Sequence, residues 1–174
     1  MTTVRRAVLV EGVSDAAALK ALSTRFGDLL RRRGVAVVPM GGATNVRRYT
    51  ELLGEQGLGL PLTGLCDAGE ERFFRAVLPA EAVLVCHLDL EEELIRSLGA
   101  EAVVEVIEAQ GEGSAWQLFR RQPAQRERSP AAQLRRFLGT HSGRKERYAA
   151  AMCAVMALSR IPGPLAAVLT ETEE

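Results

Sequence analysis

The sequence predicts an α/β protein in which a parallel four-stranded sheet is flanked by helices and followed by a helical C-terminal region. Of the 174 residues, 47% are hydrophobic and 25% are charged, which is typical of a globular domain with a core. Short apolar runs alternate with helix-period segments between Ala7 and Asp89, the pattern of βαβ units. After Asp89 the apolar runs stop and only helical patterns follow.

The first strand is predicted at Ala7–Val10, where an apolar run ends at Glu11-Gly12. Ser14 offers an N-cap for the helix that follows, and apolar residues recur at helical spacing until the chain reaches Gly34. By the same reasoning we expect strands at Val35–Pro39, Leu60–Cys66 and Ala82–Cys86, and helices at Thr44–Glu55, Glu70–Leu78, Glu91–Leu98, Ala100–Ala109, Ser114–Arg121, Pro130–Leu138 and Arg144–Ser159.

The domain organisation follows from this order. Residues 1–110 are expected to form the α/β core, and residues 111–174 a helical extension that packs on it within one structural domain. Three cysteines without a C-x-x-C spacing predict neither a zinc site nor a disulfide framework. The start reads as a strand and no apolar run is long enough to span a bilayer, so we expect a cytoplasmic protein without a membrane segment.

Charge is balanced overall but divided along the chain. The sequence has 22 basic and 22 acidic residues, yet residues 61–112 hold 12 acidic and 3 basic ones, whereas residues 113–160 hold 2 acidic and 10 basic ones. This division predicts a cation site beside a surface that attracts polyanions. It is equally compatible with two parts of one protein that attract each other.

Acidic residues follow three of the four predicted strands, at Glu11, Asp67 and Asp89, and Asp15 comes one helical turn after Glu11. The carboxyl ends of parallel strands meet at one edge of a sheet, so these carboxylates are expected to converge. Crowded carboxylates repel one another unless a cation neutralises them, and oxygen ligands suit Mg²⁺ or Mn²⁺. The alternative is that each acid caps a helix, and for Asp15 alone the cap is favoured.

These motifs carry a family resemblance. The stretch VLVEGVSDAAAL resembles the opening motif of TOPRIM domains, and Asp67 and Asp89-Leu90-Glu91 fall where the later acidic motifs lie. The stretch LDLEEELIRSLG, with SGRKERYAAAM downstream, resembles the TOPRIM module of OLD-family (overcoming lysogenisation defect) nucleases. The likeness extends over nearly the whole chain and implies a Rossmann-like sheet.

The resemblance implies a phosphodiesterase that uses one or two Mg²⁺ or Mn²⁺ ions and cuts DNA, as an endonuclease or nickase of the two-metal type. The residues it implies are the metal ligands Glu11, Asp15, Asp67, Asp89 and Glu91 and, as catalytic residues, Glu11 and the distal basic residue Lys145.

Two features depart from the family pattern. The second motif of TOPRIM domains is normally Asp-x-Asp, but here Gly69 stands where the second acid belongs, and Glu70 or Glu71 would have to replace it. The family's ATPase domain is also missing, because the chain has no GxxxxGK[ST] loop. A separate ATPase subunit would therefore be needed for any coupling to ATP.

Further candidates lie in a turn and on a helix. Gly41 and Gly42 lie between a strand and a helix, where their N–H groups could face a phosphate or simply form a tight turn. Arg144, next to Lys145, is a candidate DNA contact among several arginines that would equally suit a solvated helix face.

Three functions therefore compete. The leading one is a metal-dependent nuclease that acts on DNA. The second is a catalytically weak or inactive module that binds nucleic acid or an ATPase partner, which Gly69 favours. The third is a phosphoacceptor domain of the receiver type, which the long helical region fits poorly.

Overall fold

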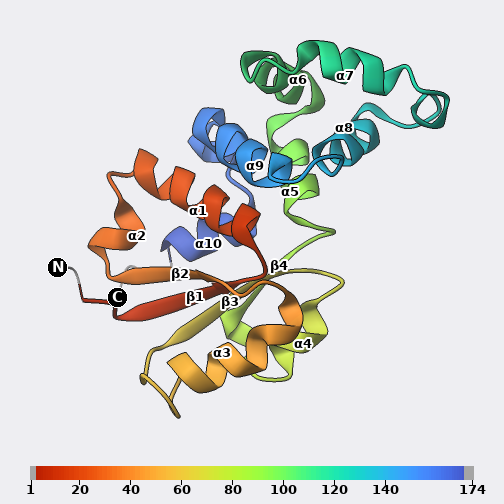
Figure 1. The fold of residues 1–174 in the computed structure, drawn as a ribbon. Helices are drawn as coiled ribbons and strands as arrows, with labels where there is room; N and C mark the ends of the chain where they lie inside the picture. The colour runs from red at the N-terminus through yellow and green to blue at the C-terminus, as the bar shows by residue number, and fades with distance from the viewer. Residues whose placement is uncertain (1–2, 171–174) are drawn as a thin grey trace.

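The computed structural model describes residues 3–170 and contains the predicted parallel sheet (Figure 1). Strand β1 (Arg6–Val10) pairs with β2 (Val35–Pro39) on one side and with β3 (Leu62–Asp67) on the other, and β4 (Val83–Cys86) pairs with β3. The order is β2-β1-β3-β4 and every pair is parallel. The predicted fold class is confirmed.

The strand register brings the carboxyl ends of the strands to one edge of the sheet. Val10, the last residue of β1, lies opposite Pro39 of β2 and Leu65 of β3. From β1 the chain passes first to β2 on one side, and β3 is then added on the other side, so the strand order reverses between β1 and β3. In open α/β sheets, ligands bind in the crevice outside the carboxyl ends at such a point.

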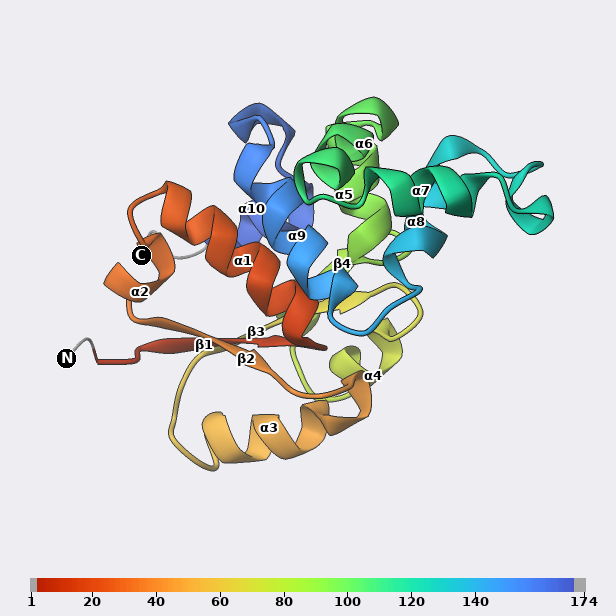
Figure 2. The same cartoon turned by 45° about the horizontal axis from the view of Figure 1, so that its top comes forward.

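Helices cover both faces of the sheet (Figures 1 and 2). One face carries α3 and α4, and the other carries α1, α2 and α10. Side chains alternate accordingly: Leu9 packs in a cluster with Phe74 of α4, whereas Val8 and Val10 pack in the larger cluster with Leu19 of α1. The bounds are α1 Val13–Arg25, α2 Leu29–Arg32, α3 Val46–Leu53, α4 Glu71–Arg75 and α10 Gly163–Thr170, with 3₁₀ turns η1 Ala43–Asn45 and η2 Ala80–Ala82.

The helical region that follows β4 shares the larger hydrophobic cluster with the sheet, because Cys86, Ile107, Phe137 and Met152 all belong to it. Helices α6 and α7 lie farthest from the sheet in Figure 1. Within residues 3–170, no helix is both long enough and apolar enough to cross a bilayer. The elements are α5 Leu90–Leu98, α6 Ala100–Ala109, α7 Gly113–Arg120, η3 Pro123–Gln125, α8 Pro130–Leu138, α9 Arg144–Val155 and η4 Leu158–Arg160.

Helix α9 packs along α1, and this pairing matters for the site (Figure 2). Arg25, the last residue of α1, donates through Nη1 to the carbonyl oxygens of Cys153 and Met156 at the end of α9, at 2.9 and 2.6 Å. The two helices therefore run in the same direction. Their first turns, which carry Asp15 and Lys145, lie at the same end.

Several boundaries differ from the sequence-based expectation. The first predicted helix is two helices, because Gly27 and Asp28 adopt left-handed backbone conformations with φ of +66° and +56°. Gly12, and not Ser14, is the N-cap of α1. Helix α10 was not predicted, although Pro164 in its first turn is a helix-start signal.

A partly buried polar cluster at the start of α9 connects elements of the helical region. Glu112 accepts hydrogen bonds from Arg144 Nη2 at 2.9 Å and from the Tyr148 hydroxyl at 2.7 Å, and it also forms an ion pair with Arg147. These donors lower the pKa of Glu112 to about 2. Arg144 is only 5% exposed, so Glu112 supplies the negative charge that its burial requires.

Replacement of Glu112 tests this cluster. Glu112→Ala leaves the buried Arg144 guanidinium without its anionic partner, and we expect the free energy of unfolding to fall by about 3 kcal/mol. Urea unfolding followed by circular dichroism measures the change. Glu105→Ala, at an exposed position of α6, is the control and should shift stability by no more than about 0.5 kcal/mol. Equal losses in both variants would contradict the assigned role of Glu112.

Candidate metal centre

Glu11 and Asp67 lie on either side of the point where the strand order reverses. Glu11 directly follows β1, and Asp67 is the last residue of β3. Glu11 Oε1 accepts a hydrogen bond from the backbone N–H of Asp67 at 2.7 Å. Asp67 Oδ1 in turn accepts from the backbone N–H of Leu90 at 3.2 Å, at the first residue of α5. The two carboxylates therefore link β1, β3 and α5 at the edge of the sheet.

Asp15 lies in the first turn of α1 and is 8% exposed. Its Oδ2 accepts from the backbone N–H of Gly12 at 2.9 Å, so it fastens the start of the helix in the way that the sequence favoured for this residue. Electrostatic repulsion nevertheless couples Asp15 to Asp67 and Glu91. The cap and the convergence of acids therefore coexist. We call Glu11, Asp15, Asp67, Asp89 and Glu91 together the acidic edge.

Three members of the acidic edge form no ion pair within residues 3–170. Burial raises the pKa of Glu11, Asp15 and Asp67, and repulsion from neighbouring carboxylates raises each one further. The pKa reaches about 7 for both Asp15 and Asp67. None of the ion pairs within residues 3–170 includes any of these three side chains. This is the electrostatic condition under which a bound cation stabilises a site.

The other two members of the acidic edge are paired with cations from the helical region. Glu91, 5% exposed, faces Lys145 of α9, with Nζ 3.3 Å from Oε2. Asp89 is the N-cap of α5, and its Oδ1 accepts from the backbone N–H of Glu92 at 2.8 Å. Asp89 Oδ2 accepts from Arg135 of α8, from Nε at 2.7 Å and also from Nη2. The sequence suggests Asp89 as a metal ligand, but both of its carboxylate oxygens already accept hydrogen bonds.

The position of the missing second acid is open in the structure. A Cβ atom built on Gly69 would meet no atom within 4 Å, and the backbone of Gly69 is not in the left-handed region. Of the two proposed substitutes, Glu70 is electrostatically coupled to Glu11, whereas Glu71 forms an ion pair with Arg75 along α4. Glu70 is thus the better placed of the two.

Two other sequence candidates have different surroundings from those expected. The N–H of Gly42 donates to the carbonyl oxygen of Glu11 at 2.9 Å, so it ties the turn at Gly41 and Gly42 to β1 and is not directed at a phosphate. Arg144 is buried against Glu112 and the Phe137 ring, not at the acidic edge, because its guanidinium serves the polar cluster described above. Of the Arg144-Lys145 pair, only Lys145 reaches the acidic edge, where it pairs with Glu91.

The donor set fits a hard divalent cation, although the side chains are not gathered into a finished cage. Within residues 3–170, no three His, Cys, Asp or Glu side chains are placed so that they could hold one ion as they stand. Among the described residues, Glu11 and Asp67 each use one carboxylate oxygen in the hydrogen bonds given above, which leaves the second oxygen for a cation. Mg²⁺ is usually bound through one or two carboxylates and keeps several of its waters.

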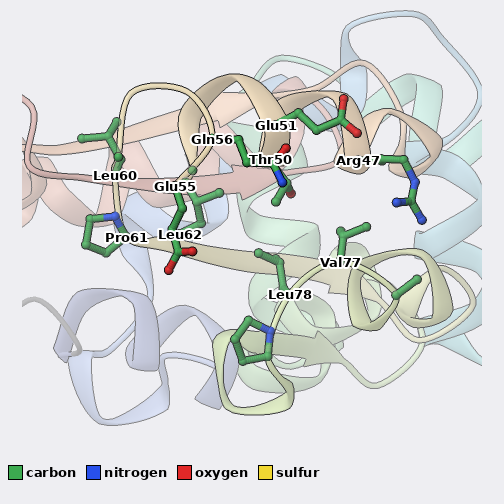
Figure 3. Close-up of a pocket in the computed structure, with 14 residues that line it drawn as sticks. Arg47, Thr50, Glu51, Glu55, Gln56, Leu60, Pro61, Leu62, Val77 and Leu78 are labelled. Atoms are coloured by element: carbon green, nitrogen blue, oxygen red, sulfur yellow. The ribbon is translucent and has the colours of Figure 1, made fainter.

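A separate cavity of about 670 Å³ lies away from the acids (Figure 3). It is lined by α3, the segment that leads into β3, and the residues around Leu78. Leu62, at the start of β3, lines it, whereas Asp67 stands at the opposite end of that strand. The acidic edge contributes no lining residue, so this cavity is not part of the candidate metal centre.

Comparison with known proteins agrees with this geometry. Residues 4–68 match the family model for the overcoming lysogenization defect protein-like TOPRIM domain. Over this segment the chain resembles the OLD-like TOPRIM domain. The matched segment begins just before β1 and ends just after Asp67, so it contains Glu11, Asp15 and Asp67.

The fold of the chain resembles that of the C-terminal regions of two OLD proteins. The C-terminal region of the Burkholderia pseudomallei OLD protein is 19% identical, with a TM-score of 0.68 over 97% of this chain and 96% of that chain. The C-terminal region of the Xanthomonas campestris pv. campestris OLD protein is 22% identical, with a TM-score of 0.68 over 99% and 96% of the two chains. A comparison with curated protein sequences gives no match.

Sequence reasoning missed one residue at the acidic edge. Arg135 was one of several arginines that would suit a solvated helix face, but it is the one that reaches Asp89. No local motif distinguishes it from Arg136 beside it. Its role depends on how α8 packs against α5, a tertiary contact that spacing within α8 does not encode.

The raised pKa values predict how the stability of the metal-free protein depends on pH. An acid with a higher pKa in the folded chain binds protons more strongly there, so the free energy of unfolding falls as pH rises. For Asp15 and Asp67 the fall should extend from their ordinary value of 3.8 to about 7, and Mg²⁺ should reduce it. Glu112, whose pKa is lowered from 4.5 to about 2, acts mainly below this window and in the opposite direction, because its contribution to stability rises with pH.

Urea unfolding in EDTA at several pH values measures this dependence. Asp15→Asn keeps an acceptor for the Gly12 N–H but removes the charge, so its stability should fall less between about pH 4 and about pH 7. Asp28→Asn, at an exposed residue that pairs with Arg31, is the control and should keep the wild-type slope. Identical slopes in all three proteins would show that the pKa of Asp15 is not raised in the folded chain.

Proposed function

We propose that this chain is a Mg²⁺- or Mn²⁺-dependent phosphodiesterase that cuts DNA, as an endonuclease or nickase. The observation that carries the proposal is the set of three half-buried to buried carboxylates, Glu11, Asp15 and Asp67, which have no cationic partner within residues 3–170. They lie at the topological switch point of a TOPRIM sheet, where α/β proteins bind ligands. The OLD-like TOPRIM match adds the expectation of a nuclease.

The roles of the side chains follow from their surroundings. Glu11, Asp15 and Asp67 would hold the ions, with Glu91 on the far side of the acidic edge and Glu70 near Glu11. Bound divalent ions would supply activation of water and stabilisation of charge on the phosphate and the leaving oxygen. Lys145 Nζ orients Glu91 and presents a positive charge to a phosphate at the same edge. Glu11 fixes the Asp67 backbone through Oε1, which keeps the two strand ends at a constant separation.

Cleavage of supercoiled plasmid with and without Mn²⁺ tests the proposal. Wild-type protein should convert plasmid to nicked or linear forms only with the metal. Glu11→Gln keeps the acceptor for the Asp67 N–H but loses the charge, so we expect at least a hundredfold (~10²) loss of rate with an unchanged circular dichroism spectrum. Glu55→Gln, on the exposed segment after α3, should cut like wild type. Metal-independent cutting, or full activity of Glu11→Gln, would contradict the proposal.

Restoration of the second acid is a gain-of-function test. Gly69→Asp places a carboxylate in open space two residues after Asp67, where TOPRIM domains normally carry one. We expect Mn²⁺ to bind about tenfold more tightly, as measured by isothermal titration calorimetry, because a further anionic ligand reaches the same ions. Gly163→Asp adds the same charge at an open position of α10 and should leave the affinity unchanged. Equal affinities in both variants would place Gly69 outside the metal centre.

A second function is favoured by Gly69 and by the unfinished geometry of the carboxylates. The chain would then be a catalytically weak or inactive module that binds nucleic acid or an ATPase polypeptide. Plasmid binding that is seen in gel shifts without any Mn²⁺-dependent cleavage would favour this function over the nuclease.

A further inference from the structure

We infer that Arg135 binds a phosphate of the nucleic-acid substrate at the acidic edge, and that Asp89 is the anchor of Arg135 and not a metal ligand. The inference rests on the proposed function, since it assigns part of the same site. The first observation is the geometry of the pair. Arg135 Nε and Nη2 both donate to a single oxygen, Asp89 Oδ2, while Asp89 Oδ1 caps α5 through the Glu92 N–H. The Asp89 carboxylate is therefore saturated.

The guanidinium of Arg135, in contrast, is only partly used. Its side chain is 49% exposed, whereas the Asp89 side chain is 12% exposed. Within residues 3–170, Nη1 of Arg135 forms no hydrogen bond, and Nη2 has a second N–H beyond the one directed at Asp89. A planar guanidinium with open N–H groups suits bidentate contact with phosphate oxygens better than an ammonium does.

The position of Arg135 is fixed by the packing of two helices. Its neighbours Leu134, Phe137 and Leu138 are at most 1% exposed, so α8 is held firmly in the core. On the other side, Asp89 precedes Leu90, which is 2% exposed and whose backbone N–H donates to Asp67 Oδ1. An arginine held at both ends presents its free N–H groups in one orientation, which lowers the entropic cost of phosphate binding.

Arg135 lies near the proposed metal ligands but forms no hydrogen bond with Glu11, Asp15 or Asp67. The negative charges of Asp89, Glu91 and Asp67 raise the pKa of Arg135, so its guanidinium faces the acidic edge. Its hydrogen bonds go to Asp89 and to none of Glu11, Asp15 and Asp67. A phosphate bound to ions at those three carboxylates would thus have a fixed cation beside it.

Arg136 supplies a matched comparison. It is adjacent in the sequence and exposed, and it forms no ion pair within the described residues. It has the same charge as Arg135 but lacks the anchor. A general attraction to DNA predicts equal effects of the two arginines, whereas an anchored phosphate site predicts unequal ones.

The test measures DNA binding and metal binding separately in the full chain. Fluorescence anisotropy with a labelled DNA duplex in Ca²⁺ gives the DNA Kd without relying on cleavage. We expect Arg135→Ala to raise this Kd about tenfold and Arg136→Ala to raise it by about twofold or less. Isothermal titration with Mn²⁺ should give affinities within about twofold of wild type for both variants, and circular dichroism should confirm their folding.

Asp89→Asn sharpens the test, because the two roles of Asp89 predict opposite results. Removal of a negative charge beside a polyanion should by itself strengthen DNA binding. If Asp89 anchors Arg135, Asp89→Asn weakens DNA binding several-fold and leaves Mn²⁺ affinity nearly unchanged. The asparagine keeps an Oδ1 acceptor for the Glu92 N–H, so the start of α5 is preserved.

The inference would be overturned by equal losses in Arg135→Ala and Arg136→Ala, by tighter Mn²⁺ binding in Arg135→Ala, or by a large loss of Mn²⁺ affinity in Asp89→Asn. The second would mean that Arg135 blocks a metal ligand, and the third that Asp89 is one. Wild-type protein that binds no DNA would overturn the proposed function together with this inference. Wild type that binds DNA, with variants that bind equally well, would overturn the inference alone.

Discussion

The structure depends on carboxylates that hold the ends of parallel strands together by accepting backbone N–H groups. Glu11 holds the end of β3 through the Asp67 N–H, and Asp67 holds the start of α5 through the Leu90 N–H. Strand ends and helix starts leave N–H groups without partners, and an ionised acceptor satisfies them strongly. The same arrangement crowds negative charge in a half-buried space. Two unit charges 4 Å apart repel by about 4 kcal/mol at an effective dielectric constant of 20, so the crowding needs relief.

Positively charged side chains of the helical region relieve this repulsion for only part of the acidic edge. Arg135 and Lys145 neutralise Asp89 and Glu91, while Arg144 and Arg147 neutralise Glu112 farther along. These pairs join the acidic middle of the chain to its basic C-terminal third, so the division of charge in the sequence does draw the two parts together. The attraction does not extend to Glu11, Asp15 and Asp67, which form no ion pair within residues 3–170 and whose pKa values are raised by burial and by neighbouring carboxylates.

The elements of the fold that have a strong local signal were predictable from the sequence. Each strand was recognised because it is a short apolar run bounded by turns, and α8 has the predicted bounds, with Ser129 as its N-cap. The helix break at Asp28 was missed because it follows from a left-handed conformation that helical spacing does not reveal. For the site, the strand-end acids were predictable from parallel topology. The burial of Arg144 and the reach of Arg135 were not, because both depend on how helices distant in sequence pack.

The division of the acidic edge also narrows where a divalent ion belongs. A cation gains most where negative charge is unpaired, and it gains little at Asp89, where an arginine is already bound and both oxygens are engaged. The unpaired carboxylates lie across β1, β3 and the first turn of α1, whereas the paired ones lie toward α8 and α9. An ion at the first group and fixed cations at the second would contact one phosphate from two sides. If the proposed site is correct, the helical region does more than cover the sheet, because it supplies the positive side chains of a site whose carboxylates come mainly from the strand ends.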